Sequence, residues 1–141
     1  MKKNFFAVFF VCTFLLTACD EGSSNSVPQE MQYIKTSMFY DTVTDMYNNP
    51  DHYLGGNYHF VGELYSMTND AGDTYYSIYG TDPSDRDCGI GIELKWDDFS
   101  GIAVGDSITV EGTLDTETET VDDVERTFLI LRPTLVEKRD Q

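Results

Sequence analysis

The chain has 141 residues, of which 40% are hydrophobic and 13% aromatic, a size that allows one small globular domain and leaves no room for two. Nine basic side chains stand against twenty-five acidic ones, which gives a formal net charge of −16. A surface this acidic is short of the cations that neutralise phosphate, so the composition argues against a nucleic-acid partner.

The N-terminal segment has the layout of a secretory signal peptide. Two lysines precede an uncharged apolar run from Phe5 to Leu16, and this run is shorter than the roughly 20 residues that span a bilayer as a helix. The next residues, Leu16-Thr17-Ala18-Cys19, resemble the lipobox of bacterial lipoproteins, whose cysteine is acylated before cleavage. We therefore expect residues 1–18 to be a lipoprotein signal peptide. An ordinary secretory signal with a chance cysteine is the alternative.

Lipidation of Cys19 would place the mature chain on a membrane. Two or three acyl chains anchor a protein far more firmly than one. Residues 20–30 read DEGSSNSVPQE, a small polar composition typical of a flexible linker, and we assign residues 19–36 to the anchor and linker. The resemblance implies an extracytoplasmic location and leaves the inner and outer membranes both open.

The folded part retains a single thiol. Cys12 belongs to the predicted signal peptide and Cys19 to the anchor, which leaves Cys88 and no internal disulfide. Asp85 and Asp87 lie next to Cys88 in the sequence, and such acidic neighbours disfavour a thiolate nucleophile.

From Gly55 to Glu137 the sequence alternates between apolar and polar residues in short runs bounded by turn residues, which predicts an all-β domain. The runs cover residues 58–65, 74–79, 89–96, 107–114 and 126–131. Gly62 and Gly112 lie inside the first and fourth runs, where glycine usually marks a bend or a close backbone approach. Such bends are what a small barrel needs to close.

One helix is predicted before the strands. Phe39, Val43, Met46 and Tyr47 have helical spacing within Ser37–Asn48. We expect Ser37 to cap the helix and the following Asn49-Pro50 to end it. The last strand is apolar at adjacent positions, Phe128 to Leu131, which predicts burial on both faces. We expect the helix to cover its second face.

The helix-to-strand junction Asn49-Pro50-Asp51-His52-Tyr53-Leu54-Gly55, with Val61-Gly62 and the run from Gly105 to Leu114, resembles the OB-fold. More narrowly, it resembles small bacterial envelope proteins with tRNA-anticodon-like OB domains. The resemblance covers about Ser37–Glu137 and implies a five-stranded barrel preceded by one short helix, without implying tRNA binding. We assign this OB-fold domain to residues 37–141. Some relatives have a cysteine pair where this chain has only Cys88, and their helix between strands three and four would be reduced here to Asp97–Gly101.

OB barrels bind ligands on the face of strands two and three and in the adjoining loops. In this sequence that face would hold Tyr75, Ser77, Tyr79, Glu93 and Lys95, rimmed by Asn69–Asp73 and Asp115–Glu125. The tyrosines could stack on bases, but the basic groove that single-stranded nucleic acid requires is missing. A peptide or a carbohydrate could use the same tyrosines, and aromatic pairing across strands for stability alone is a further explanation.

Other candidate sites are weaker. Six carboxylates between Asp115 and Glu125 could hold calcium, although a solvated hairpin whose charges prevent edge aggregation explains them as well. His52 and His59 are the only possible histidine bases, and neither has an evident nucleophile; a dyad of His59 with Cys88 is left open. Metal-ligand spacing is absent from the sequence. We expect neither an enzyme nor a cofactor.

These observations lead to one functional expectation and one alternative. We expect a lipid-anchored, extracytoplasmic OB-fold module that binds a protein or peptide of the cell envelope, by its barrel face or a strand edge. The alternative is a lipoprotein that binds a small ligand or calcium.

Overall fold

The computed structural model describes residues 30–121 and 123–140. The predicted signal peptide, Cys19 and most of the predicted linker lie outside the described residues. Among the helices that are described, none has both the length and the apolar character needed to cross a membrane.

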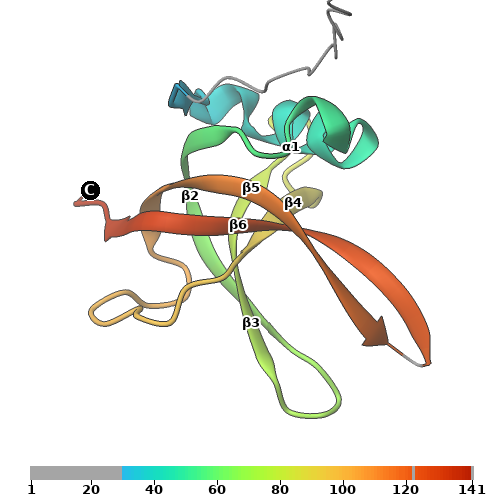
Figure 1. Cartoon of the computed structure of the whole chain (residues 1–141). Helices are drawn as coiled ribbons and strands as arrows, with labels where there is room; N and C mark the ends of the chain where they lie inside the picture. Colours follow the sequence, from blue (N-terminus) through green and yellow to red (C-terminus); the bar gives the residue numbers. More distant parts are fainter. Residues whose placement is uncertain (1–29, 122, 141) are drawn as a thin grey trace, which may run out of the picture.

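Five strands curl into a barrel (Figure 1). They are β2 (Asn57–Thr68), β3 (Thr74–Thr81), β4 (Gly89–Leu94), β5 (Ser107–Val121) and β6 (Val124–Lys138). The sheet has the order β2-β3-β4-β6-β5, and pairing of β2 with β5 closes it. Only β4 and β6 are parallel neighbours within this barrel. This five-stranded mixed barrel has the strand order of the OB-fold, which confirms the predicted fold class.

The interior of the barrel follows the predicted alternation. The inward-facing side chains of the strands are buried. Phe60, Ile92 and Leu114, for example, are each 0% exposed. The side chains between them point outward and are mostly polar or aromatic. The period-two pattern therefore identified which face of each strand forms the core.

Both strand glycines lie where two backbones come close. β2 leaves β5 and begins to pair with β3 at Glu63, and a Cβ atom on the preceding Gly62 would lie 2.6 Å from the carbonyl oxygen of Tyr79. Gly112 adjoins an irregularity in the β5–β6 register, where a Cβ atom would lie 2.5 Å from the carbonyl oxygen of Arg132. The predicted bends are confirmed, and only glycine fits them.

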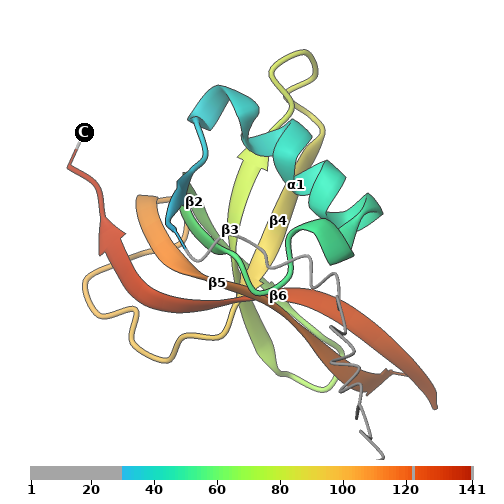
Figure 2. The ribbon, with the colours of Figure 1, turned by 45° about the horizontal axis from the view of Figure 1, so that its top comes forward.

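β5 and β6 are longer than predicted. They continue past the barrel as a two-stranded ribbon, residues 116–121 paired with 124–129, which we call the arm (Figure 2). The segment Asp115–Glu125 was predicted to be a rim loop or a solvated hairpin; in the structure it is a hairpin, mostly strand, and the chain turns near Asp123, which has a φ of 62°. Alternating threonine and acidic residues are themselves a strand pattern, and threonine favours strands.

The helix α1 (Phe39–Asn48) continues from a short 3₁₀ turn, η1 (Thr36–Met38). Ser37 was predicted to cap α1, but it lies inside η1, and the residue before α1 makes no side-chain cap bond. Asn49 ends the helix as predicted, and a second 3₁₀ turn, η2 (Pro50–His52), leads to the barrel.

The apolar side of α1 closes one end of the barrel. Phe39, Val43 and Met46 are buried there, and the neighbours of α1 in the sheet include β2, β3 and β4. A Cβ atom on Gly80 of β3 would lie 2.4 Å from the Phe39 ring, so helix and strand are in direct contact. No helix interrupts residues 95–106, where the resemblance allowed a reduced one.

The folded part begins before residue 37. β1 (Gln32–Tyr33) pairs in parallel with β2 at Tyr58 and His59, and the Ile34 amide donates to the His59 carbonyl at 3.0 Å. Residues 32–36, which the sequence assigned to the linker, are therefore part of the domain.

Replacement of Phe39 by alanine should separate α1 from the barrel. Phe39 is 2% exposed and its ring lies 5.5 Å from that of Phe60, so Phe39→Ala should lower the free energy of unfolding by about 3–5 kcal/mol. Its neighbour Met38 is 49% exposed, and Met38→Ala should change the free energy by less than about 0.5 kcal/mol. Urea denaturation measures both; equal losses would contradict the packing described here.

Candidate binding groove

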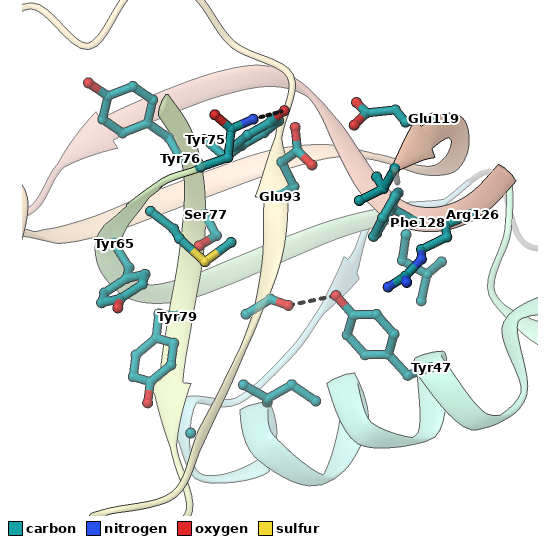
Figure 3. A pocket seen from close by; sticks show the side chains of 17 residues that line it. Tyr47, Tyr65, Tyr75, Tyr76, Ser77, Tyr79, Glu93, Glu119, Arg126 and Phe128 are labelled. Atoms are coloured by element: carbon teal, nitrogen blue, oxygen red, sulfur yellow. Dashed lines mark hydrogen bonds between the residues drawn. The ribbon is translucent and has the colours of Figure 1, made fainter. Parts of the chain in front are cut away.

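A groove of about 520 Å³ crosses the outer face of β3 and β4, between the β2–β3 hairpin and the arm (Figure 3). Its lining comes from six elements, because α1 contributes a side chain in addition to the five barrel strands. The groove is bounded by two walls and a floor, which are built from different kinds of residue.

The first wall is aromatic and comes from β2 and β3. Tyr75 and Tyr79 point outward from alternate positions of β3, and Tyr65 does so from β2. Met67 is paired with Tyr75 across the two strands and lines the same groove. The rings of Tyr65 and Tyr79 stack at 5.3 Å with an angle of 29° between their planes. Tyr65 and Met67 remain 49% and 62% exposed, so this wall presents apolar surface to solvent.

The floor is made of residues with little or no side chain. Ser77 and Gly91 lie there on adjacent strands, and a Cβ atom on Gly91 would lie 3.4 Å from that of Ser77. Gly89 lies under the Tyr79 ring, where a Cβ atom would be 1.8 Å from the phenol oxygen. Small residues on a strand let a ligand or another backbone approach closely.

The second wall combines the arm with α1. Phe128 and Arg126 project from β6 and Glu119 from β5, and Tyr47 lies beside them at the end of α1 (Figure 3). The Tyr47 hydroxyl donates a hydrogen bond to the carbonyl oxygen of Gly91 at 2.8 Å. Burial, and after it the charge of Glu93, raises the pKa of Tyr47, so the phenol stays protonated and remains a donor.

Lys95 forms an ion cluster beside the groove. Its ammonium nitrogen lies 2.7 Å from Glu93, 2.8 Å from Glu117 and 3.5 Å from Glu119. Burial by itself would lower the pKa of Lys95, but its hydrogen bonds to Glu117 and Glu93 and the charges of these carboxylates outweigh burial and raise it. Lys95 is therefore a fixed cation whose charge is more than neutralised by its three acidic partners.

This cluster spans three strands. Glu93 belongs to β4 and Glu117 to β5, while β6 lies between these two strands in the sheet. Ile130 of β6 is opposite Glu93 in register and is 0% exposed. Since paired residues point to the same side of a sheet, the Lys95 side chain passes over the face on which Ile130 lies. The helix was predicted to cover this second face of β6; it packs mainly against β4, β3 and β2 instead, and the ion cluster lies on the side of Ile130.

Four of the five residues predicted for the binding face line the groove: Tyr75, Ser77, Tyr79 and Glu93. Lys95 is the exception, since it is bonded to the acidic side chains of the cluster. From the predicted rims, Asn69, Glu119 and Val121 line the groove. Tyr65 and Met67 were missed although their outward alternation was readable from sequence. No sequence signal placed Tyr47 or Phe128 here, because both positions depend on tertiary structure.

The described acidic residues between Asp115 and Glu125 are not arranged as a cation site. Glu117 and Glu119 contact Lys95, and Asp115 forms an ion pair with Arg132 at 2.7 Å. Within the described ranges there is no group of three or more acidic, histidine or cysteine residues arranged to hold a metal ion.

The possible dyad of His59 and Cys88 is not assembled. The His59 ring nitrogen Nδ1 lies 2.8 Å from Glu111 on the neighbouring strand. Cys88 is exposed just before β4, and its thiol lies 3.4 Å from the Asp85 carboxylate. Each side chain has a partner close to its own strand or loop, and neither lines the groove.

Comparison with known proteins adds little to this description. No family model matches the chain, and no curated protein sequence matches it. Among solved structures, the chain is similar to a small single-stranded DNA-binding protein from Streptomyces coelicolor, with a TM-score of 0.40 and 16% sequence identity, over 60% of this chain and 94% of that one. A likeness this distant says nothing about what the groove binds.

Loss of the Lys95 charge should loosen the arm. In Lys95→Met three carboxylates would repel one another without a cation between them, and the free energy of unfolding should fall by about 1–3 kcal/mol. Lys138→Met removes a more exposed pair, with Asp106 at 2.7 Å, and should cost less than about 1 kcal/mol. Urea denaturation at neutral pH compares the two; a larger loss in Lys138→Met would contradict the role given to Lys95.

Proposed function

We propose that the chain is a binding module on the extracytoplasmic face of a bacterial membrane, held there by lipid on Cys19, and that its groove takes a polypeptide segment of another envelope component. The observation that carries this proposal is the form of the groove. An aromatic wall and a second wall of aromatic and charged side chains enclose a floor of Ser77 and Gly91, which leaves an open trough rather than an enclosed cavity.

A trough of this kind suits an extended polypeptide. Tyrosine supplies contact area at low conformational cost and is enriched where proteins bind one another. The exposed side chains of Tyr65 and Met67 would bury apolar surface against a partner, and the floor would admit its main chain. The aromatic residues that form the walls are therefore the expected binding hot spots.

The charge of the site opposes a nucleic acid. Glu93 and Glu119 line the groove beside Arg126, and the nearby Lys95 is surrounded by three carboxylates. Single-stranded nucleic acid requires cations along its phosphates. The groove provides aromatic surface without that charge, which favours a polypeptide over a nucleic acid.

The membrane location is supported by the sequence alone. The apolar run, the small residues and Cys19 follow one another in the order of a lipoprotein signal. Cys19→Ser should release the chain from the membrane fraction and abolish incorporation of labelled palmitate. Membrane recovery of Cys19→Ser equal to that of the unmodified sequence would refute the anchor.

Removal of two groove tyrosines should abolish partner capture without unfolding the barrel. Tyr75 and Tyr79 stand on the outer face of β3, so Tyr75→Ala combined with Tyr79→Ala should weaken binding at least tenfold, as expected when hot-spot aromatic side chains are lost. Affinity capture from detergent-solubilised membranes, with mass spectrometry and circular dichroism as a folding check, measures this.

Tyr33 provides the control for that experiment. It is 70% exposed and does not line the groove, so Tyr33→Ala should retain the captured protein. Equal loss of capture in both variants would contradict a binding site in the groove. Thermal stabilisation by oligosaccharides or calcium, with no captured protein, would favour the alternative of a lipoprotein that binds a small ligand.

A further inference from the structure

We propose that the partner segment is cationic and binds as an added β-strand along the edge of β6 in the arm, an inference that rests on the proposed peptide-binding function and specifies its mode. Strand addition joins a peptide to an exposed sheet edge through main-chain hydrogen bonds. Three features of the groove support it: a split in the sheet, a free backbone edge and an acidic surround.

The groove lies in a split between β4 and β6. These strands pair in only two positions, Glu93 with Ile130 and Leu94 with Leu131, and the Lys95 amide donates to the Leu131 carbonyl at 3.0 Å. Towards their N-terminal ends the strands diverge: β4 continues beside β3, and β6 continues with β5 into the arm (Figure 2). Both diverging segments line the groove.

The direction of the backbone groups on β6 follows from its known bonds. The Leu131 carbonyl points towards β4 because it accepts from Lys95. Alternate residues of a strand direct their N–H and C=O groups to the same side, so Leu129, Thr127 and Glu125 also present theirs to the split. None of the described strands pairs with β6 on this side before Ile130.

The opposite edge of the split is already occupied. The carbonyl of Gly91 on β4 faces away from β3 and accepts the hydrogen bond of Tyr47, and α1 packs against β4. An added strand would therefore pair with β6. Its neighbouring side chains would face Phe128 on the arm and the tyrosine wall across the floor (Figure 3).

The arm has a second free edge that faces away from the groove. The backbone of Leu114 on β5 accepts a hydrogen bond from the Gly55 amide at 2.8 Å and donates one to the Gly56 carbonyl at 3.0 Å. The backbone N–H and C=O groups of even-numbered residues from Leu114 onward therefore point away from β6. Thr118 is one of them, and it is paired across the ribbon with Thr127, with 3.1 Å between their hydroxyl oxygens. The two threonines are directly opposite each other in the ribbon, and they differ in that the backbone N–H of Thr127 lies on the groove edge and that of Thr118 on the outer edge.

The acidic residues around the groove favour a positively charged partner segment. The turn between β2 and β3 carries Asp70 and Asp73, the loop between β3 and β4 carries Asp82, Asp85 and Asp87, and the tip of the arm carries Asp123 and Glu125. These segments connect the strands that form the groove, and Arg86 and Arg126 are the basic residues among them. The free edge from Val124 to Leu129 is about 20 Å long at roughly 3.3 Å per residue, enough for about six residues of a lysine- or arginine-rich strand.

Proline substitutions at the two threonines distinguish binding at the groove edge from binding at the outer edge. Thr127→Pro removes an N–H from the groove edge, and Thr118→Pro removes the equivalent N–H from the outer edge; neither removes a hydrogen bond between β5 and β6. The probe is a fluorescent ten-residue peptide of alternating valine and lysine, titrated into the full chain in mild detergent. Thr127→Pro should weaken binding at least tenfold and Thr118→Pro less than threefold. Equal affinities for these two variants, both folded by circular dichroism, would overturn the proposal.

Backbone-methylated peptides test the same point on the unaltered protein, so that a variant that fails to fold leaves the proposal testable. Methylation of the valine nitrogens or of the lysine nitrogens blocks one edge of the peptide at a time. One series should lose at least tenfold in affinity relative to the other. Equal affinities of the two series, with binding still dependent on Tyr75 and Tyr79, would overturn strand addition and leave peptide binding in place.

A change of peptide charge completes the test. The corresponding peptide of valine and glutamate should bind at least tenfold more weakly than the lysine peptide, because the groove is surrounded by carboxylates. Tighter binding of the glutamate peptide would overturn the cationic partner. Absence of binding for every peptide, together with binding of an oligosaccharide, would overturn both this inference and the proposed function.

Discussion

One ammonium group ties together strands that are not neighbours. Lys95 contacts Glu93 on β4 and Glu117 and Glu119 on β5, and its side chain crosses the strand between them. Before Ile130, β6 has no partner among the described strands except β5, so the two strands of the arm extend beyond the barrel paired with each other. The bridge therefore links the arm to β4, and both of them line the groove.

The same short pairing both closes the barrel and opens the groove. β4 and β6 need only two paired positions to complete the sheet, since α1 closes the adjacent end with Phe39, Val43 and Met46. Because α1 covers this end of the barrel, the core is closed there although β4 and β6 do not pair along their full length. The unpaired lengths of β4 and β6 become the sides of a binding site, and Tyr47 satisfies the Gly91 carbonyl on one of them.

Sequence patterns predicted the parts of this structure that depend on local physics. Alternation predicted the first four strands and their buried faces, a run of adjacent apolar residues predicted the fifth, and the glycines at 62 and 112 indicated the two close backbone approaches. The Thr-Glu repeat was predicted to be a rim loop or a solvated hairpin, and the structure has the hairpin. The cover over Ile130 was assigned to the helix, since no pattern reveals that a lysine will reach across a strand.

The candidate site was predictable to the same extent. Tyr75, Ser77 and Tyr79 followed from the outward face of one strand, a local property. Tyr47 and Phe128 come from a helix and an arm whose placement depends on long-range packing. The free edge of β6 could not be predicted at all, because it depends on where the pairing with β4 stops.

Hydrogen exchange of backbone amides, followed by NMR with and without the valine–lysine peptide, tests the central claim most directly. A strand added in the groove would protect the amides of Glu125, Thr127 and Leu129, while those of Thr116, Thr118 and Thr120 on the outer edge continue to exchange as in the free chain. Protection confined to the outer edge, or bound peptide with no change in exchange along β6, would contradict the claim.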